Sequence, residues 1–191
     1  MSRRIRLRRK LYLMSAPVLL LIVVLSLKLI SVVSAGDAAR SQFRERDIAA
    51  LESTVSLLRV FDVVEPEKTA FAAGDLEVLA GRLPEAQQRF LESLAGTDPA
   101  QSCPVRINLL LVQETLGDLA FREGRRDDSV RSYQDALAVA GQAPAGCFAG
   151  NDDPDEQRRA VRADTVARLQ DKLAFVTGPV IAAPPPPPPP A

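Results

Sequence analysis

Two segments of this chain carry the same pattern of glycine, small and aromatic residues. Residues 74 to 94 read GDLEVLAGRLPEAQQRFLESL, and residues 117 to 137 read GDLAFREGRRDDSVRSYQDAL. The matching positions are Gly74 and Gly117, Gly81 and Gly124, Ala86 and Ser129, Phe90 and Tyr133, Ser93 and Ala136, and Leu94 and Leu137. Glycine lets two helices approach closely or allows a tight turn, and the small and aromatic residues interlock between the helices. Each segment is therefore predicted to be a helical hairpin, and this spacing needs no catalytic explanation.

The chain after residue 40 has helical periodicity throughout, without the sustained alternation of a half-buried strand. Helices are expected over residues 41–62, 66–80, 84–96, 105–123 and 127–141. A sixth, over 153–176, would begin with Asp153 as its cap and Pro154 in its first turn. Its narrow apolar stripe suits a helix that caps a helical stack. The expected fold class is all-α, with a helical domain over residues 41–177.

The N-terminus has the composition of a membrane anchor. Residues 1–10 form a basic cap, and residues 11–35 contain a 23-residue apolar run, 11 to 33, with Lys28 as its only charge. About 20 such residues can cross a bilayer as a helix, and positive charges before the run favour a cytoplasmic N-terminus. We therefore expect a single-pass protein of the cell membrane with an extracytoplasmic domain. The alternative is a secretory signal cleaved after Ala35, which would leave a secreted helical binding protein.

The charges are unevenly distributed, although the formal net charge is zero. Seven of the 24 basic residues lie in the first 35 positions, which hold no acidic residue, so the rest carries 17 basic against 24 acidic side chains. An acidic body repels phosphates, so nucleic acid is not an expected partner. The chain has no histidine, the commonest general base and zinc ligand, and no Gly-rich phosphate loop. We expect neither enzyme activity nor a cofactor.

Cys103 and Cys147 are the only cysteines of the chain. In an exported domain a disulfide is their expected use, with free thiols as the alternative. The acidic stretch NDDPDE, residues 151–156, offers oxygen ligands for calcium but lacks the ordered 12-residue spacing of a calcium loop, and Asp followed by Pro also suits a helix start. No metal site is expected.

The Pro-rich tail, residues 178–191, contains seven consecutive prolines at 184–190. We expect this run to be a spacer or a disordered end. The alternative is that it is a ligand for an aromatic groove.

The repeated spacing resembles the tetratricopeptide repeat, whose glycine, alanine and aromatic positions fall at the same places. The resemblance covers residues 67–140, and 43–66 in part, but the two units are offset by 43 residues instead of 34. It implies a short array with a partner groove formed by the first helix of each pair. The implied groove residues are Phe71, Asp75, Val78, Glu114, Asp118, Phe121 and Arg122. Glu114 and Asp118, expected to face solvent, would favour an electropositive or apolar segment as ligand.

The whole layout also resembles a class of actinobacterial membrane proteins, often encoded beside von Willebrand A type proteins and a MoxR-like ATPase. The features that carry this resemblance are the basic cap, the late lysine of the apolar run, DVVEPEK, the repeat pair, and CPVRINL with a later cysteine. It implies an interaction scaffold that binds other membrane or envelope proteins, von Willebrand A type proteins among them. The alternatives are a structural spacer or self-associating domain, and a histidine-independent hydrolase that uses Glu114 and Asp118 as paired carboxylates. The oligomeric state stays open.

Overall fold

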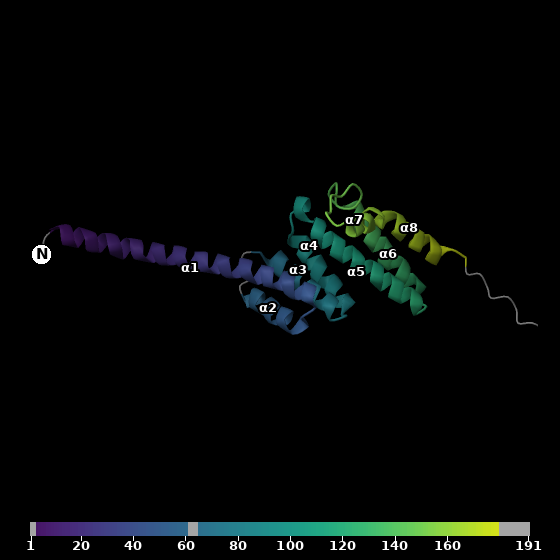
Figure 1. The fold of residues 1–191 in the computed structure, drawn as a ribbon, viewed down its shortest axis with the longest axis horizontal. Coiled ribbons are helices and arrows are strands. Elements are labelled where there is room, and N and C mark those ends of the chain that lie inside the picture. The colour runs from purple at the N-terminus through teal and green to yellow at the C-terminus, as the bar shows by residue number, and fades with distance from the viewer. Residues whose placement is uncertain (1–2, 61–64, 180–191) are drawn as a thin grey trace, which may run out of the picture. The chain divides into compact units, whose positions relative to one another are not determined.

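The computed structural model describes residues 3–60 and 65–179, and within these ranges the chain forms helices and no strand (Figure 1). The all-α fold class is thereby confirmed. The chain divides into two compact units, Met1–Arg82 and Leu83–Ala191, which are described separately. The proline run at 184–190 lies outside the described residues.

The first unit contains three helices, α1 (Arg3–Glu45), α2 (Ile48–Val60) and α3 (Pro66–Leu79). The end of α1, α2 and α3 pack together around Ala39, Leu51, Val55, Ala73 and Leu76, with Phe43, Ala72 and Leu79 at the edge of this core. The predicted helix over 66–80 and the burial of Leu51 and Val55 are confirmed.

A turn at Arg46 and Asp47 divides the helix that was predicted over residues 41–62. Arg46 has a φ of 57°, in the left-handed region, and Oδ1 of Asp47 accepts a hydrogen bond of 3.0 Å from the backbone N–H of Ala50 in the first turn of α2. Asp47 is thus a helix N-cap, a role for which aspartate is well suited. The prediction missed the turn because neither glycine nor proline marks it.

The predicted transmembrane segment over residues 11–35 lies inside α1, and the single-pass topology is wrong. Within residues 3–60 and 65–179, no helix combines the length and the apolar character needed to cross a membrane. The apolar run is one stretch of a 43-residue helix that begins at Arg3 and continues through Asp37 and Arg44 to Glu45. The prediction treated these charged ends as flanks of a separate span. The predicted location was the cell membrane, with a cytoplasmic N-terminus and an extracytoplasmic domain. This prediction depended on the membrane span and is therefore wrong as well.

The second unit is built around a long central helix, α5 (Cys103–Arg122). It packs against α4 (Leu83–Gly96) on one side and α6 (Arg126–Gly141) on the other, and α6 packs against α8 (Thr165–Thr177), as Figure 1 shows. Two short elements, the 3₁₀ turn η1 (Pro99–Gln101) and α7 (Glu156–Ala163), complete the unit. The helices predicted over 84–96, 105–123 and 127–141 are confirmed with small shifts of their ends.

The α5–α6 hairpin is held together by the glycine and the aromatic residue that the repeat pattern singled out. A Cβ atom on Gly117 would lie 2.5 Å from Cε1 of Tyr133, so the ring occupies the space that a side chain would need. Gly124 has a φ of 75° and ends α5, with its N–H bonded to Phe121 O and the N–H of Arg125 bonded to Ala120 O. This pair of bonds is the Schellman motif.

The same turn occurs in the first unit. Gly81 also has a φ of 75°, and its N–H bonds Val78 O while the N–H of Arg82 bonds Glu77 O. Glycine adopts this left-handed backbone without the strain that a side chain would introduce. The repeated pattern therefore specifies the same helix ending at both positions.

The helix predicted over 153–176 is divided into α7 and α8 at Asp164. Asp155, and not Asp153, caps α7, because its Oδ1 accepts a hydrogen bond of 2.9 Å from the N–H of Arg158. In α8, Leu169 and Val176 are buried, whereas Val166 is exposed. The last helix of the described chain therefore packs its apolar side on the hairpin.

Candidate functional site

The residues of the predicted partner groove are divided between the two units. Phe71, Asp75 and Val78 lie on α3 of the first unit, where each is half-buried. The other four, Glu114, Asp118, Phe121 and Arg122, lie on α5 of the second unit. The α5 residues have well-defined neighbours, and these define the candidate site.

Three residues of α5 face three residues of α8 in matched order. Glu114, Asp118 and Phe121 contact Arg168, Lys172 and Phe175, respectively, and both sets have i, i+4, i+7 spacing. Because the two residues of each of these three pairs are 54 positions apart, the two helices run in the same direction at this contact. We call these six residues the α5–α8 seam.

The buried part of the seam is an ion pair between Glu114 and Arg168. Nε of Arg168 donates to Oε1 of Glu114 at 2.9 Å, and Nη2 donates to Oε2 at 3.0 Å, which is the bidentate geometry of a strong charged hydrogen bond. The side chain of Glu114 is only 9% exposed. Nζ of Lys172 lies 2.8 Å from Oε1 of the same carboxylate. The expectation that Glu114 faces solvent is therefore wrong.

Asp118 receives the other contacts of Lys172. Nζ of Lys172 donates to Oδ1 at 2.8 Å and to Oδ2 at 2.7 Å, while the hydroxyl of Tyr133 donates to Oδ1 at 2.6 Å. Nζ also lies 5.8 Å from the centre of the Tyr133 ring. Asp118 is half-buried. One lysine thus links both carboxylates of α5 to the tyrosine that fills the space beside Gly117.

The electrostatics of the seam keep its groups charged and paired. Burial by itself raises the pKa of Glu114, but hydrogen bonds from Arg168 and Lys172 outweigh this effect and hold the pKa below its ordinary value. Burial, together with the hydrogen bond to Asp118, raises the pKa of Tyr133 to about 12. Glu114 is therefore held in its charged form near neutral pH, paired with two cations.

The seam ends in two exposed aromatic rings. The ring centres of Phe121 and Phe175 are 5.5 Å apart and their planes meet at 65°, an edge-to-face contact. Phe121 is 40% exposed and Phe175 is 72% exposed. Arg122, next to Phe121 on α5, is also exposed. The seam therefore pairs its four charges internally and leaves two aromatic rings exposed at its end.

Sequence reasoning identified the α5 side of the seam but missed the α8 side. Arg168, Lys172 and Phe175 repeat the spacing of Glu114, Asp118 and Phe121 with opposite charges. That complementarity is the signal which could have paired the two helices. It was overlooked because only the apolar stripe of the last predicted helix was used to place that helix.

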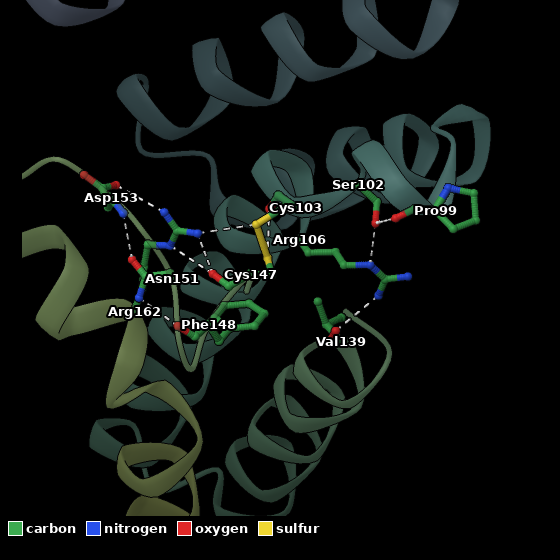
Figure 2. Close-up of a disulfide and its surroundings, with 10 residues drawn as sticks. All are labelled: Pro99, Ser102, Cys103, Arg106, Val139, Cys147, Phe148, Asn151, Asp153 and Arg162. Atoms are coloured by element: carbon green, nitrogen blue, oxygen red, sulfur yellow. Dashed lines mark hydrogen bonds and ion pairs between the residues drawn. A yellow bond between two sulfur atoms is a disulfide. The ribbon is translucent and has the colours of Figure 1, made fainter. Parts of the chain in front are cut away.

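The second cluster of polar contacts surrounds the disulfide between Cys103 and Cys147 (Figure 2). Cys103 begins α5, Cys147 lies in the loop after α6, and their Cα atoms are 5.4 Å apart. The predicted pairing is confirmed. Arg162 of α7 donates to Cys147 O from Nε at 3.0 Å and from Nη2 at 2.6 Å. The disulfide and this arginine together fasten α7 and the loop to the start of α5.

Arg106 supports the same corner from α5. Its Nε donates to Ser102 Oγ at 3.0 Å and its Nη1 to Val139 O at 3.1 Å, as Figure 2 shows. Arg106 is 9% exposed, and all of these contacts lie at the ends of helices. The corner therefore has the character of a structural joint between α5, α6 and the loop.

The acidic stretch at 151–156 is engaged by arginines. Asp153 accepts from Nη2 of Arg158 at 3.0 Å and from Nη1 of Arg162 at 3.2 Å. These contacts, led by the one with Arg158, lower the pKa of Asp153 to about 2. In the part of the chain that the structure describes, no three His, Cys, Asp or Glu side chains are placed to hold a metal ion. The arginines thus take the role that a cation would have.

Comparison of the chain with protein-family models, with curated proteins and with solved structures finds no match. The resemblances to the tetratricopeptide repeat and to the actinobacterial class rest on the residues quoted for them.

Proposed function

We propose that this protein is an interaction module, a short tetratricopeptide-like array that binds a segment of another protein at the exposed end of the α5–α8 seam. The observation that carries the proposal is the pair of exposed rings, Phe121 and Phe175, on two helices that are joined by the ion pairs of the seam. Aromatic residues on a rigid surface are the side chains that most often supply binding energy at protein interfaces.

The packing of the second unit supports the tetratricopeptide-like part of the proposal. The close approach of Gly117 to Tyr133 and the Schellman turn at Gly124 are what the repeat pattern requires of its hairpin. The helix α8 runs in the same direction as α5, as the first helix of a following repeat would. In this proposal α8 both caps the array and completes its binding surface.

The charges of the seam decide which ligand chemistry fits. Glu114 and Asp118 are neutralised by Arg168 and Lys172, so they offer little attraction to a basic segment. The exposed rings favour apolar, aromatic or proline side chains, and Arg122 can donate hydrogen bonds to a backbone or side-chain oxygen. We therefore expect an apolar segment, and von Willebrand A type proteins are the first candidates to test because of the sequence resemblance.

A photo-crosslinking residue at position 175, compared with one at position 131, tests the proposal in cells. Arg131 is a suitable control because its side chain is 66% exposed and lies on α6. We expect a partner that is captured at 175 and not at 131. With that partner purified, Phe175→Ala should weaken binding about tenfold, and Arg131→Ala by less than about twofold, because few central residues dominate such interfaces.

Two results would contradict the proposal. One is capture of the same proteins at both positions, and the other is an equal effect of the two substitutions on the affinity. Circular dichroism of both variants checks that the helical fold is retained. If the purified chain instead crosslinks to itself at position 175, the alternative of a self-associating domain is favoured.

A further inference from the structure

We propose that the rings of Phe121 and Phe175 bind this chain's own proline run, residues 184–190, which thereby competes with partner proteins for the exposed end of the seam. The inference rests on the proposed binding function and specifies its ligand class, a segment with the polyproline II conformation. The exposed aromatic pair and the seven consecutive prolines have no structural role in the fold described above, and the inference assigns them to each other.

The chemistry of the two partners is complementary. A run of prolines favours the polyproline II helix, which has no internal hydrogen bonds and loses little conformational freedom on binding. Its recognition elsewhere depends on exposed aromatic rings, against which the proline rings pack. Phe175, 72% exposed, and Phe121, 40% exposed, provide such rings on adjacent helices. The exposed guanidinium of Arg122, beside Phe121, can donate to the free carbonyl groups of the proline run.

The start of the tail is held close to this surface. Gly178 follows α8 with φ −61° and ψ 163°, so the chain leaves the helix in an extended conformation. The Arg126 side chain of α6 donates to the carbonyl groups of Val176 and Gly178. Phe175 lies only two residues before the end of α8 at Thr177. The tail therefore emerges from an anchored point near the aromatic pair.

The length of the chain between this anchor and the prolines is sufficient for a return to the rings. Five residues, 179–183, separate Gly178 from Pro184, and their extended reach is about 17 Å. The helical distance from residue 168 to residue 175 is about 10 Å, so this reach spans the α8 side of the seam. A seven-proline rod is about 22 Å long and can cross both helices. A tether this short keeps the proline run at an effective concentration on the order of millimolar.

A tryptophan at position 175 gives a direct measurement. The chain has no tryptophan, so Phe175→Trp provides the only indole signal, and the exposure of Phe175 makes the change compatible with the fold. The full chain is compared with the same chain in which 184–190 is an alternating Gly/Ser sequence. We expect emission at shorter wavelength with the proline tail, because the indole is then covered. Leu91→Trp, at an exposed position of α4, is the control and should give the same emission with either tail.

A synthetic seven-proline peptide measures the competition. For an effective concentration about ten times the dissociation constant of the peptide, the tail closes the site in about nine molecules of ten. The Gly/Ser chain should then bind the peptide about tenfold more tightly than the native chain, and Phe175→Ala in the Gly/Ser chain should abolish binding. The ring resonances of the wild-type phenylalanines, compared by NMR for the two tails, give a second readout that needs no tryptophan.

Equal emission, equal ring resonances or equal peptide affinity with the two tails would overturn the inference. A tail effect that grows with protein concentration would also overturn it, because the tail would then act on a second copy. Failure of the proposed function has a different signature. Partner capture at position 175 without any tail effect refutes only the tail, whereas a tail effect without partner capture refutes only the partner-binding proposal.

Discussion

Replacement of Gly117 by alanine tests the packing on which the hairpin depends. A Cβ atom at this position would lie 2.5, 2.8 and 3.1 Å from Cε1, Cδ1 and Cζ of Tyr133. Carbon atoms that are not bonded prefer separations of about 3.5 to 4.0 Å, so the ring or the helix must move by about 1 Å. Tyr133 is 3% exposed and hydrogen-bonded to Asp118 at 2.6 Å, which leaves it little room to move.

The expected magnitude follows from two opposing effects. Alanine favours the helix over glycine by about 1 kcal/mol. Overpacking costs about 1 to 3 kcal/mol, and a displaced Tyr133 ring also weakens a hydrogen bond to a charged group, worth about 1.5 to 3 kcal/mol. We expect Gly117→Ala to lower the free energy of unfolding by about 2 kcal/mol, which lowers the melting temperature by about 10 °C in a unit of this size.

Urea and thermal unfolding, followed by circular dichroism at 222 nm, measure this change. Gly141→Ala is the matched control, because Gly141 ends α6 and a Cβ there meets no atom within 4 Å. It should leave stability unchanged or slightly raised. A second substitution, Tyr133→Leu, removes the ring atoms that clash, so the double variant should lose less than the sum of the two single losses. If Gly117→Ala is as stable as Gly141→Ala, the inferred helix contact is wrong.

The other two predictions concern the disulfide and the buried ion pair. The intact mass should rise by one hydrogen per cysteine on reduction, and equal masses before and after reduction would refute the bond. Replacement of Cys103 and Cys147 by serine should lower the free energy of unfolding by up to about 4 kcal/mol, because the bond closes a loop that spans 44 residues of sequence. The folded-state pKa of Glu114 is lower than its ordinary value of 4.5, so its contribution to stability should be complete above that pH and should be lost as the pH falls through the folded-state pKa. Glu114→Gln should lower the free energy of unfolding by about 2 kcal/mol at pH 7 and weaken the dependence of stability on acid pH. As a control, Glu123→Gln removes an exposed pair with Arg125 and should lower it by less than about 0.5 kcal/mol. Equal losses for the two variants would contradict the role assigned to burial.

Some features were predictable because they depend on residues close in sequence. The helices over 66–80, 84–96, 105–123 and 127–141 follow from hydrophobic periodicity, and the glycine at the end of α5 follows from the backbone that its turn requires. The contact of Gly117 with Tyr133 lies within one hairpin, so the repeat pattern was sufficient to predict it. The partners of the disulfide were predictable because the chain has only two cysteines, which allow a single pairing within the chain.

Other features were decided by tertiary packing. Nothing in the local pattern distinguishes a polar helix face that meets water from one that meets a second helix with opposite charges. The pairing of Glu114 with Arg168 joins residues 54 apart, and it exists only because α8 packs against α6 in the direction of α5. The same limit explains the missed turn at Arg46 and the missed break at Asp164, where helical propensity alone would continue the helix. The membrane prediction for residues 11–35 is also wrong, because no helix within residues 3–60 and 65–179 is long and apolar enough to cross a membrane. Sequence by itself thus determined four of the helices and the hairpin contact. The tertiary structure decided which charged side chains are paired and buried and which aromatic rings stay exposed, because that choice depends on the packing of elements far apart in the chain.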